Sequence, residues 1–154
     1  MILTDWTLFF GRFHPLFVHL PIGIISFAAL LEIVAVYKKK TFLSAAINIA
    51  LLTGALSAGL AAVSGYFLSI SADYNYDVIF WHKWIGISSA VITFLAWLIR
   101  VYKKWDIPFL KIKITNWLLA SCIILITIGA HLGAKMTHGD GYLTRHMPGF
   151  LKSL

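Results

Sequence analysis

Histidines are the residues of this sequence whose type and spacing could do chemistry. Two of them lie in the stretch GRFHPLFVHLPIG, residues 11–23, where a long apolar run begins, and three more lie beside or within later apolar runs. An imidazole in an apolar segment is costly unless it is hydrogen-bonded or bound to a metal. Imidazole is also a ligand of haem iron, copper and zinc. The candidate site residues are His14, His19, His82, His131 and His138.

The spacing of these histidines predicts two tiers at one membrane surface. At a rise of about 1.5 Å per residue, His131 lies roughly 10 Å deeper than His138, and His19 lies roughly 7 Å deeper than His14. His82 begins a third apolar segment and joins the shallow tier. We predict that His19 and His131 are the axial ligands of a b-type haem, and that the shallow tier is a second ligand set or a support.

Basic residues near the same surface would face the haem propionates. They are Arg12, Lys83, Lys135 and Arg145. The sequence has no CxxCH motif for covalent haem, since its one cysteine, Cys122, lies inside an apolar run. The expected role is electron transfer as a membrane subunit, with a separate c-type cytochrome or another membrane redox subunit as the partner. Assembly into an oligomer is compatible with this role.

Other guests and roles are compatible with the same histidines. Three or more converging imidazoles would hold copper, zinc or iron without a porphyrin. The protein could also be a structural accessory subunit in which histidines only hydrogen-bond to one another. A stand-alone enzyme is not predicted, because the sequence has no HExxH, no glycine-rich phosphate loop and no recognisable pairing of a nucleophile with histidine.

Two prolines flank the first pair of histidines. Pro15 suits the first turn of a helix, where its missing N–H is no loss. Pro21 should free the Phe17 carbonyl and loosen the turn that holds His19. We predict that this freed carbonyl accepts a hydrogen bond from an imidazole N–H, which would select the ring nitrogen that is left to bind a guest.

Four apolar stretches are long enough to position these residues across a membrane. The chain of 154 residues is 60% hydrophobic and only 12% charged, whereas a soluble domain is about 25% charged. The expected fold is a single all-α domain, residues 1–154, built as an integral membrane four-helix up-down bundle with short connections. The predicted spans are roughly 15–37, 42–70, 82–101 and 114–136.

Basic residues set the expected orientation. Eight of the thirteen flank the loops near residues 38–40 and 100–113, whereas the loop SADYNYDVIFW carries two aspartates and no basic residue. The positive-inside rule then places both termini outside, in the periplasm of a bacterial inner membrane. The net charge of +7 is explained by this flanking pattern, so no nucleic-acid partner is expected. The N-terminus has no basic n-region, so no cleavable signal is expected.

Polar and small residues inside the spans have mainly structural interpretations. Glu32 and Asn48 should lie at similar depth on neighbouring helices, where a hydrogen bond between them is favoured over a role in proton transfer. The second span carries a stripe of small residues in TGALSAGLAAVSG, and the fourth has GAHLGA. Such stripes allow close helix packing or leave clearance for a flat macrocycle.

Three segments in order, FGRFHPLFVHLPIG, WHKWIGI and GAHLGAKMTHGDGYL, carry a family resemblance. The chain resembles a bacterial four-helix membrane family of unknown function with an HPxxVHxP motif, often fused to or encoded near planctomycete-type cytochrome c domains. The resemblance implies a link to electron transfer and marks the five candidate histidines as motif positions. Ala134 stands where the family pattern would have a second glycine after HLG. No fused cytochrome domain is expected, so the redox partner is expected to be a separate protein.

Overall fold

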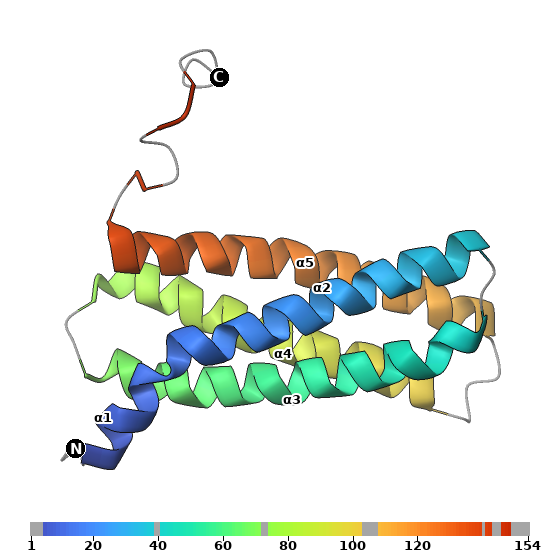
Figure 1. The fold of residues 1–154 in the computed structure, drawn as a ribbon, viewed down its shortest axis with the longest axis horizontal. Coiled ribbons are helices and arrows are strands. Elements are labelled where there is room, and N and C mark those ends of the chain that lie inside the picture. The colour runs from blue at the N-terminus through green and yellow to red at the C-terminus, as the bar shows by residue number, and fades with distance from the viewer. Residues whose placement is uncertain are drawn as a thin grey trace.

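The computed structural model describes residues 5–38, 41–71, 74–102, 108–139, 141–142 and 146–148. These residues form helices and turns, with no strand among them. The elements are α1 (Asp5–Arg12), α2 (His14–Lys38), the 3₁₀ turn η1 (Thr41–Leu43), α3 (Ser44–Ser69), α4 (Tyr76–Val101) and α5 (Pro108–His138). Figure 1 shows the four long helices side by side along one direction.

Within the described residues, four helical segments are long and apolar enough to cross a membrane: α1 together with α2, then α3, α4 and α5. The predicted all-helical fold with four spanning helices is thus confirmed, and such a chain would lie in a lipid bilayer as a multi-pass protein. Which end faces the periplasm stays a prediction. Several charges on which that prediction depends lie outside the described residues, namely Lys39, Lys40, Lys103 and Lys104.

The helices pack as two hairpins. α2 contacts α3 along its length, and α4 contacts α5 in the same way. The hairpins meet mainly through α3 and α4, whereas α2 and α5 contact each other much less. α1 lies at the end of the bundle where α5 finishes (Figure 1). We call this the histidine end, because His14 and His82 also lie there.

The core is narrow and built from medium-sized and small side chains. Its largest fully buried members are Ile25, Ile47, Leu51, Thr93, Thr115 and Cys122. Large apolar side chains such as Phe27, Leu56 and Trp117 are instead exposed around the bundle. This distribution fits a protein whose outer surface is solvated by lipid tails rather than by water.

α1 is a short helix that the sequence analysis did not predict. It begins with Asp5 and ends with Arg12, which suits the helix dipole at both ends. Gly11 lets it approach α3 closely, because a Cβ there would lie 2.8 Å from the backbone nitrogen of Leu68. Phe13 forms the turn between α1 and α2, and Pro15 falls in the first turn of α2 as expected.

Two helices start earlier than the apolar pattern indicated. α4 begins at Tyr76, where the Asn75 side chain accepts hydrogen bonds from the backbone N–H groups of Asp77 and Val78. His82 therefore lies inside α4 rather than at its start. α5 runs from Pro108 to His138 and is followed by Gly139 with a φ of 83°, a conformation typical of the residue after a helix.

Candidate functional site

His14 is held in place by the neighbouring helix. Its Nδ1 lies 2.9 Å from the backbone carbonyl oxygen of Ala61 on α3, and the Ser64 hydroxyl lies 3.4 Å from the same nitrogen. Because a carbonyl only accepts, Nδ1 carries the proton in this arrangement. The half-buried ring is then left with an unprotonated Nε2, which has no hydrogen-bond partner among the described residues.

His82 is held in the same way on the second hairpin. Its Nδ1 donates to the backbone carbonyl oxygen of Gly129 on α5 at 3.0 Å, and the ring is half-buried. Its Nε2 likewise has no hydrogen-bond partner within the part of the chain that the structure describes. Metal-binding histidines usually donate their second ring N–H to a carbonyl or carboxylate in this way. Both rings thus have the tautomer of a ligand.

The two rings lie close together at the histidine end of the bundle. Their centres lie 6.1 Å apart and their planes are perpendicular. If one metal lay between two imidazoles, two bonds of about 2.1 Å plus about 1.1 Å from each nitrogen to its ring centre would separate the centres by about 6.4 Å. The spacing of His14 and His82, which we call the histidine pair, therefore fits two axial ligands of one metal.

A glycine lies against each ring of the histidine pair. A Cβ on Gly65 would come within 2.7 Å of Cε1 of His14, and a Cβ on Gly133 would come within 3.3 Å of Cε1 of His82. The small-residue stripes of α3 and α5 thus provide the space in which the imidazoles lie. Gly54, further along α3, packs instead against Ile25.

The structure does not bring His19 and His131 together. Both are exposed, and Nδ1 of His19 contacts the backbone carbonyl of Pro15 in its own helix. Within α2, the carbonyl that contacts an imidazole is therefore that of Pro15 and not, as predicted, that of Phe17. His14 and His19 are five residues apart and point in different directions on one helix, so only one of them faces the bundle axis. That one is His14.

The remaining candidates lie at the surface. His138 is exposed and stacks on Tyr142, with ring centres 4.2 Å apart. Arg12, Lys83 and Lys135 are exposed at the histidine end, and Arg145 lies outside the described residues. Across the described part of the chain, no group of three or more His, Cys, Asp or Glu side chains is arranged to hold a metal ion.

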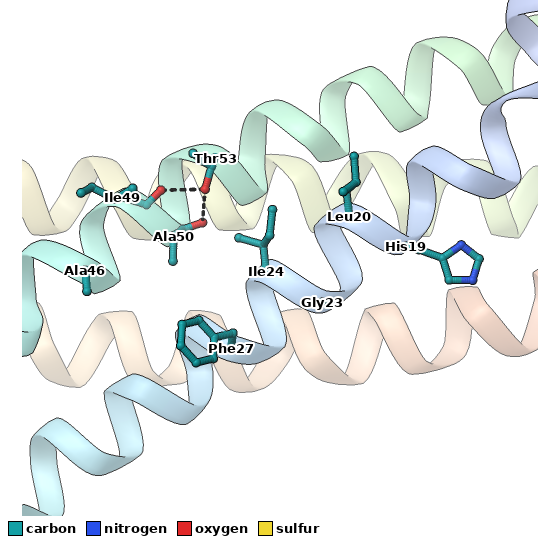
Figure 2. Close-up of a pocket in the computed structure, with 9 residues that line it drawn as sticks. All are labelled: His19, Leu20, Gly23, Ile24, Phe27, Ala46, Ile49, Ala50 and Thr53. Atoms are coloured by element: carbon teal, nitrogen blue, oxygen red, sulfur yellow. Dashed lines mark hydrogen bonds between the residues drawn. The ribbon is translucent and has the colours of Figure 1, made fainter.

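A hollow on the outer surface is lined by His19 but by neither residue of the histidine pair. It is an open groove of about 610 Å³ between α2 and α3, lined mainly by apolar atoms. Figure 2 shows His19 at the end nearer to the start of α2, and Thr53 turned back toward its own helix. The Thr53 hydroxyl donates to the carbonyl of Ile49 at 2.8 Å. The groove therefore resembles a lipid-facing surface more than a ligand site.

A second polar cluster lies toward the opposite end of the bundle. Arg100 donates to Glu32 at 2.8 Å, to Asn48 at 2.9 Å and to Ser44 at 3.3 Å. The Asn116 side-chain nitrogen, in the amide orientation that satisfies its neighbours, donates to the other Glu32 oxygen at 3.0 Å. We call this the four-helix network, because its five residues come from all four long helices.

The four-helix network was predicted only in part. The sequence predicts a Glu32–Asn48 hydrogen bond, and it places Arg100 among the charges that flank the spans. In the structure Arg100 lies between Glu32 and Asn48, and the side chains of Arg100 and Glu32 are only 8% and 6% exposed. The ion pair satisfies a carboxylate that would otherwise be buried without a positive charge.

These features define a four-span membrane protein with paired imidazoles at one end and a buried ion pair toward the other. Residues 12–145 match the family of predicted membrane proteins called DUF2231. The chain therefore belongs to this family, whose function is unknown. No curated protein and no solved structure matches the chain.

Proposed function

We propose that this protein binds a b-type haem within the membrane, with His14 and His82 as the two axial ligands, and that it transfers electrons. The observation that carries the proposal is the geometry of the histidine pair. The ring centres are 6.1 Å apart, and each Nδ1–H is bonded to a backbone carbonyl. Haem supplies the redox chemistry when bound, and the protein supplies the ligands, their tautomer and a low-dielectric surrounding.

Two converging imidazoles favour haem over a structural zinc. Zinc in a structural site takes four protein ligands, and in a catalytic site it takes three. The described residues provide two at the histidine pair and no larger cluster. Haem iron needs only two axial ligands from the protein, because the porphyrin supplies the other four.

The exposed cations at the histidine end suit the propionates of such a haem. Arg12 ends α1, and Lys83 follows His82 directly on α4. If both termini are periplasmic, as the loop charges predict, the haem would lie near the periplasmic surface. A separate c-type cytochrome or another membrane redox subunit would then be the electron partner.

Absorption spectra of the protein purified from its native membranes test this proposal. We expect a Soret band and, after dithionite reduction, an α-band. His14→Ala and His82→Ala should each abolish or strongly shift both bands, while His146→Ala, at an exposed position in the tail, should leave them unchanged. Protein that carries no haem in native membranes would end the proposal.

Two further outcomes would change the proposed ligands or the proposed cofactor. Loss of the bands in His19→Ala and His131→Ala, with His14→Ala and His82→Ala unaffected, would return the axial assignment to the pair that the sequence alone suggested. Stoichiometric copper, zinc or iron with a featureless visible spectrum would replace haem by a bare metal ion.

A further inference from the structure

The two hairpins share one pattern of polar and small residues. Glu32 and Arg100 are 68 residues apart, and the same offset relates other polar or small residues along the chain. The pairs of identical residues at this offset are His14 and His82, Ile24 and Ile92, Ala28 and Ala96, Leu30 and Leu98, Asn48 and Asn116, Leu51 and Leu119, Ala62 and Ala130, and Gly65 and Gly133. Residues 14–69 and 82–137 therefore align without a gap.

Burial follows the same offset. The buried residues of α4 are Ser89, Thr93 and Ala96, and each follows a buried residue of α2 by 68 positions: Pro21, Ile25 and Ala28 respectively. Within the described part of α5, the buried residues are Thr115, Leu119, Cys122 and Gly129. Each of these follows a buried residue of α3 in the same way: Ile47, Leu51, Gly54 and Ala61.

Contacts inside each hairpin are also equivalent. His14 bonds to Ala61 and His82 bonds to Gly129, in both cases across 47 residues. Deeper in the bundle, Gly54 packs against Ile25, since a Cβ on Gly54 would lie 2.9 Å from Cγ1 of Ile25. At the equivalent place in the second hairpin, the Cys122 sulfur lies 3.2 Å from the Thr93 hydroxyl.

Equivalent residues also meet each other across the bundle. His14 meets His82, and Glu32 meets Arg100. A residue that contacts its own equivalent lies beside the rotation axis that relates the two copies. α2 and α4 run in the same direction (Figure 1), so this pseudo-two-fold axis runs along the bundle, as in membrane proteins built from parallel repeats. The symmetry is approximate, because α3 contacts α4 much more than the equivalent helix α5 contacts α2.

The four-helix network follows this symmetry. Arg100 donates to Asn48, and Glu32 accepts from Asn116. Exchanging the two hairpins converts the first contact into the second. The network departs from the symmetry at two places. Ser44 accepts from Arg100, but its equivalent is the apolar Ile112, and at the ion pair itself the two copies carry opposite charges. Identical residues there would bury two carboxylates or two guanidinium groups against each other, which is strongly unfavourable.

We infer that the chain contains two copies of one helical hairpin, and that the buried Glu32–Arg100 pair on their pseudo-two-fold axis is the positioning element that sets His14 opposite His82. The pair joins α2 to α4, two helices that lie diagonally across the bundle and carry one residue of the histidine pair each. It therefore fixes the rotation and the height of α2 relative to α4. The inference rests on the proposed function only where haem is the readout.

Charge reversal tests the inference in the full chain. In a background with Cys122→Ala, His14→Cys and His82→Cys, a short bifunctional thiol reagent reports how close the two positions are, without any cofactor. We expect efficient cross-linking in this background and at least a fivefold loss when Glu32→Arg or Arg100→Glu is added. Adding both should restore cross-linking, because the exchanged charges find the equivalent amides of Asn48 and Asn116.

The matched control is Lys38→Glu, a charge reversal at the exposed end of α2 that should leave cross-linking unchanged. The milder Glu32→Gln keeps a folded protein available if the reversals do not fold, and it should still lower cross-linking. Undiminished cross-linking in Glu32→Gln, or a folded double reversal that fails to cross-link, would overturn the inference.

The haem readout separates this inference from the proposed function. With both histidines intact, the haem bands should weaken in each single reversal and return in the double reversal. If cross-linking follows the charges while no variant carries haem, the positioning role stands and the haem proposal falls. If haem binds but neither signal responds to the charges, the positioning role falls.

Discussion

The histidine pair and the Glu32–Arg100 pair both lie beside the inferred axis, at different heights in the bundle, yet their polar atoms are satisfied differently. At the ion pair, the carboxylate and the guanidinium bond to each other and to flanking amides. At the histidine pair, Nδ1 of each ring is bonded to a backbone carbonyl, and Nε2 has no hydrogen-bond partner among the described residues. The first arrangement needs no ligand, whereas the second leaves one ring nitrogen of each histidine for the ligand that we propose. The difference distinguishes a structural centre from a proposed binding centre.

Removing one charge should produce the largest effect on stability. Arg100→Met leaves Glu32 buried without its cation, and losing one partner of a buried ion pair costs about 3–5 kcal/mol. Unfolding in mixed micelles with a denaturing detergent measures the loss. Lys38→Met, at an exposed position, is the control and should change little.

The double variant Glu32→Met with Arg100→Met tests whether the unpaired buried charge causes this loss of stability. It should cost less than Arg100→Met alone, because no unpaired charge remains buried. A double variant less stable than the single one would mean that Glu32 is stabilised without Arg100.

The two amides of the four-helix network should contribute equally. Asn48→Ala removes an acceptor from Arg100, and Asn116→Ala removes a donor to Glu32. A hydrogen bond to a charged group contributes about 1.5–3 kcal/mol, so each variant should lose roughly that much unfolding free energy in the same assay. A large effect at one site and none at the other would contradict the equivalence of the hairpins.

At the histidine end, Gly65→Ala should displace His14, the proposed ligand. The new Cβ would lie 2.7 Å from Cε1 and 2.9 Å from Nδ1 of His14, and the ring cannot retreat without losing its bond to Ala61. Overpacking of this kind costs about 1–3 kcal/mol. We expect lower haem content and a shifted reduced spectrum, whereas Gly59→Ala on the same helix meets open space and should behave like the wild type.

The sequence was sufficient for the architecture, because apolar length and short connections determine the number of helices. It also placed the five motif histidines at one end, since alternate helices reverse direction. It could not choose the facing pair. That choice depends on the rotation of α2, which turns His14 inward and His19 outward, and on α4 starting at Tyr76, which places His82 inside the helix.

The sequence carries traces of the hairpin repeat, but they are too few to identify it alone. Asn48 and Asn116, like Gly65 and Gly133, are identical at one fixed offset. The opposite charges of Glu32 and Arg100 conceal that these two positions are equivalent, and most apolar positions exchange one hydrophobic residue for another. Only the shared burial and the shared hydrogen-bond spacing make the repeat evident.

The smallest expected effect lies at the equivalent glycine of the second hairpin. In Gly133→Ala the Cβ would lie 3.3 Å from Cε1 of His82, so the ring must move by only a few tenths of an ångström. Alanine is favoured over glycine inside a helix by about 1 kcal/mol, which should offset the crowding and leave the unfolding free energy nearly unchanged. Reduced-minus-oxidised spectra should show a smaller shift than in Gly65→Ala, with Gly86→Ala, which meets open space on α4, as the control. A larger shift in Gly133→Ala than in Gly65→Ala would mean that the second hairpin, rather than the first, confines its imidazole more tightly.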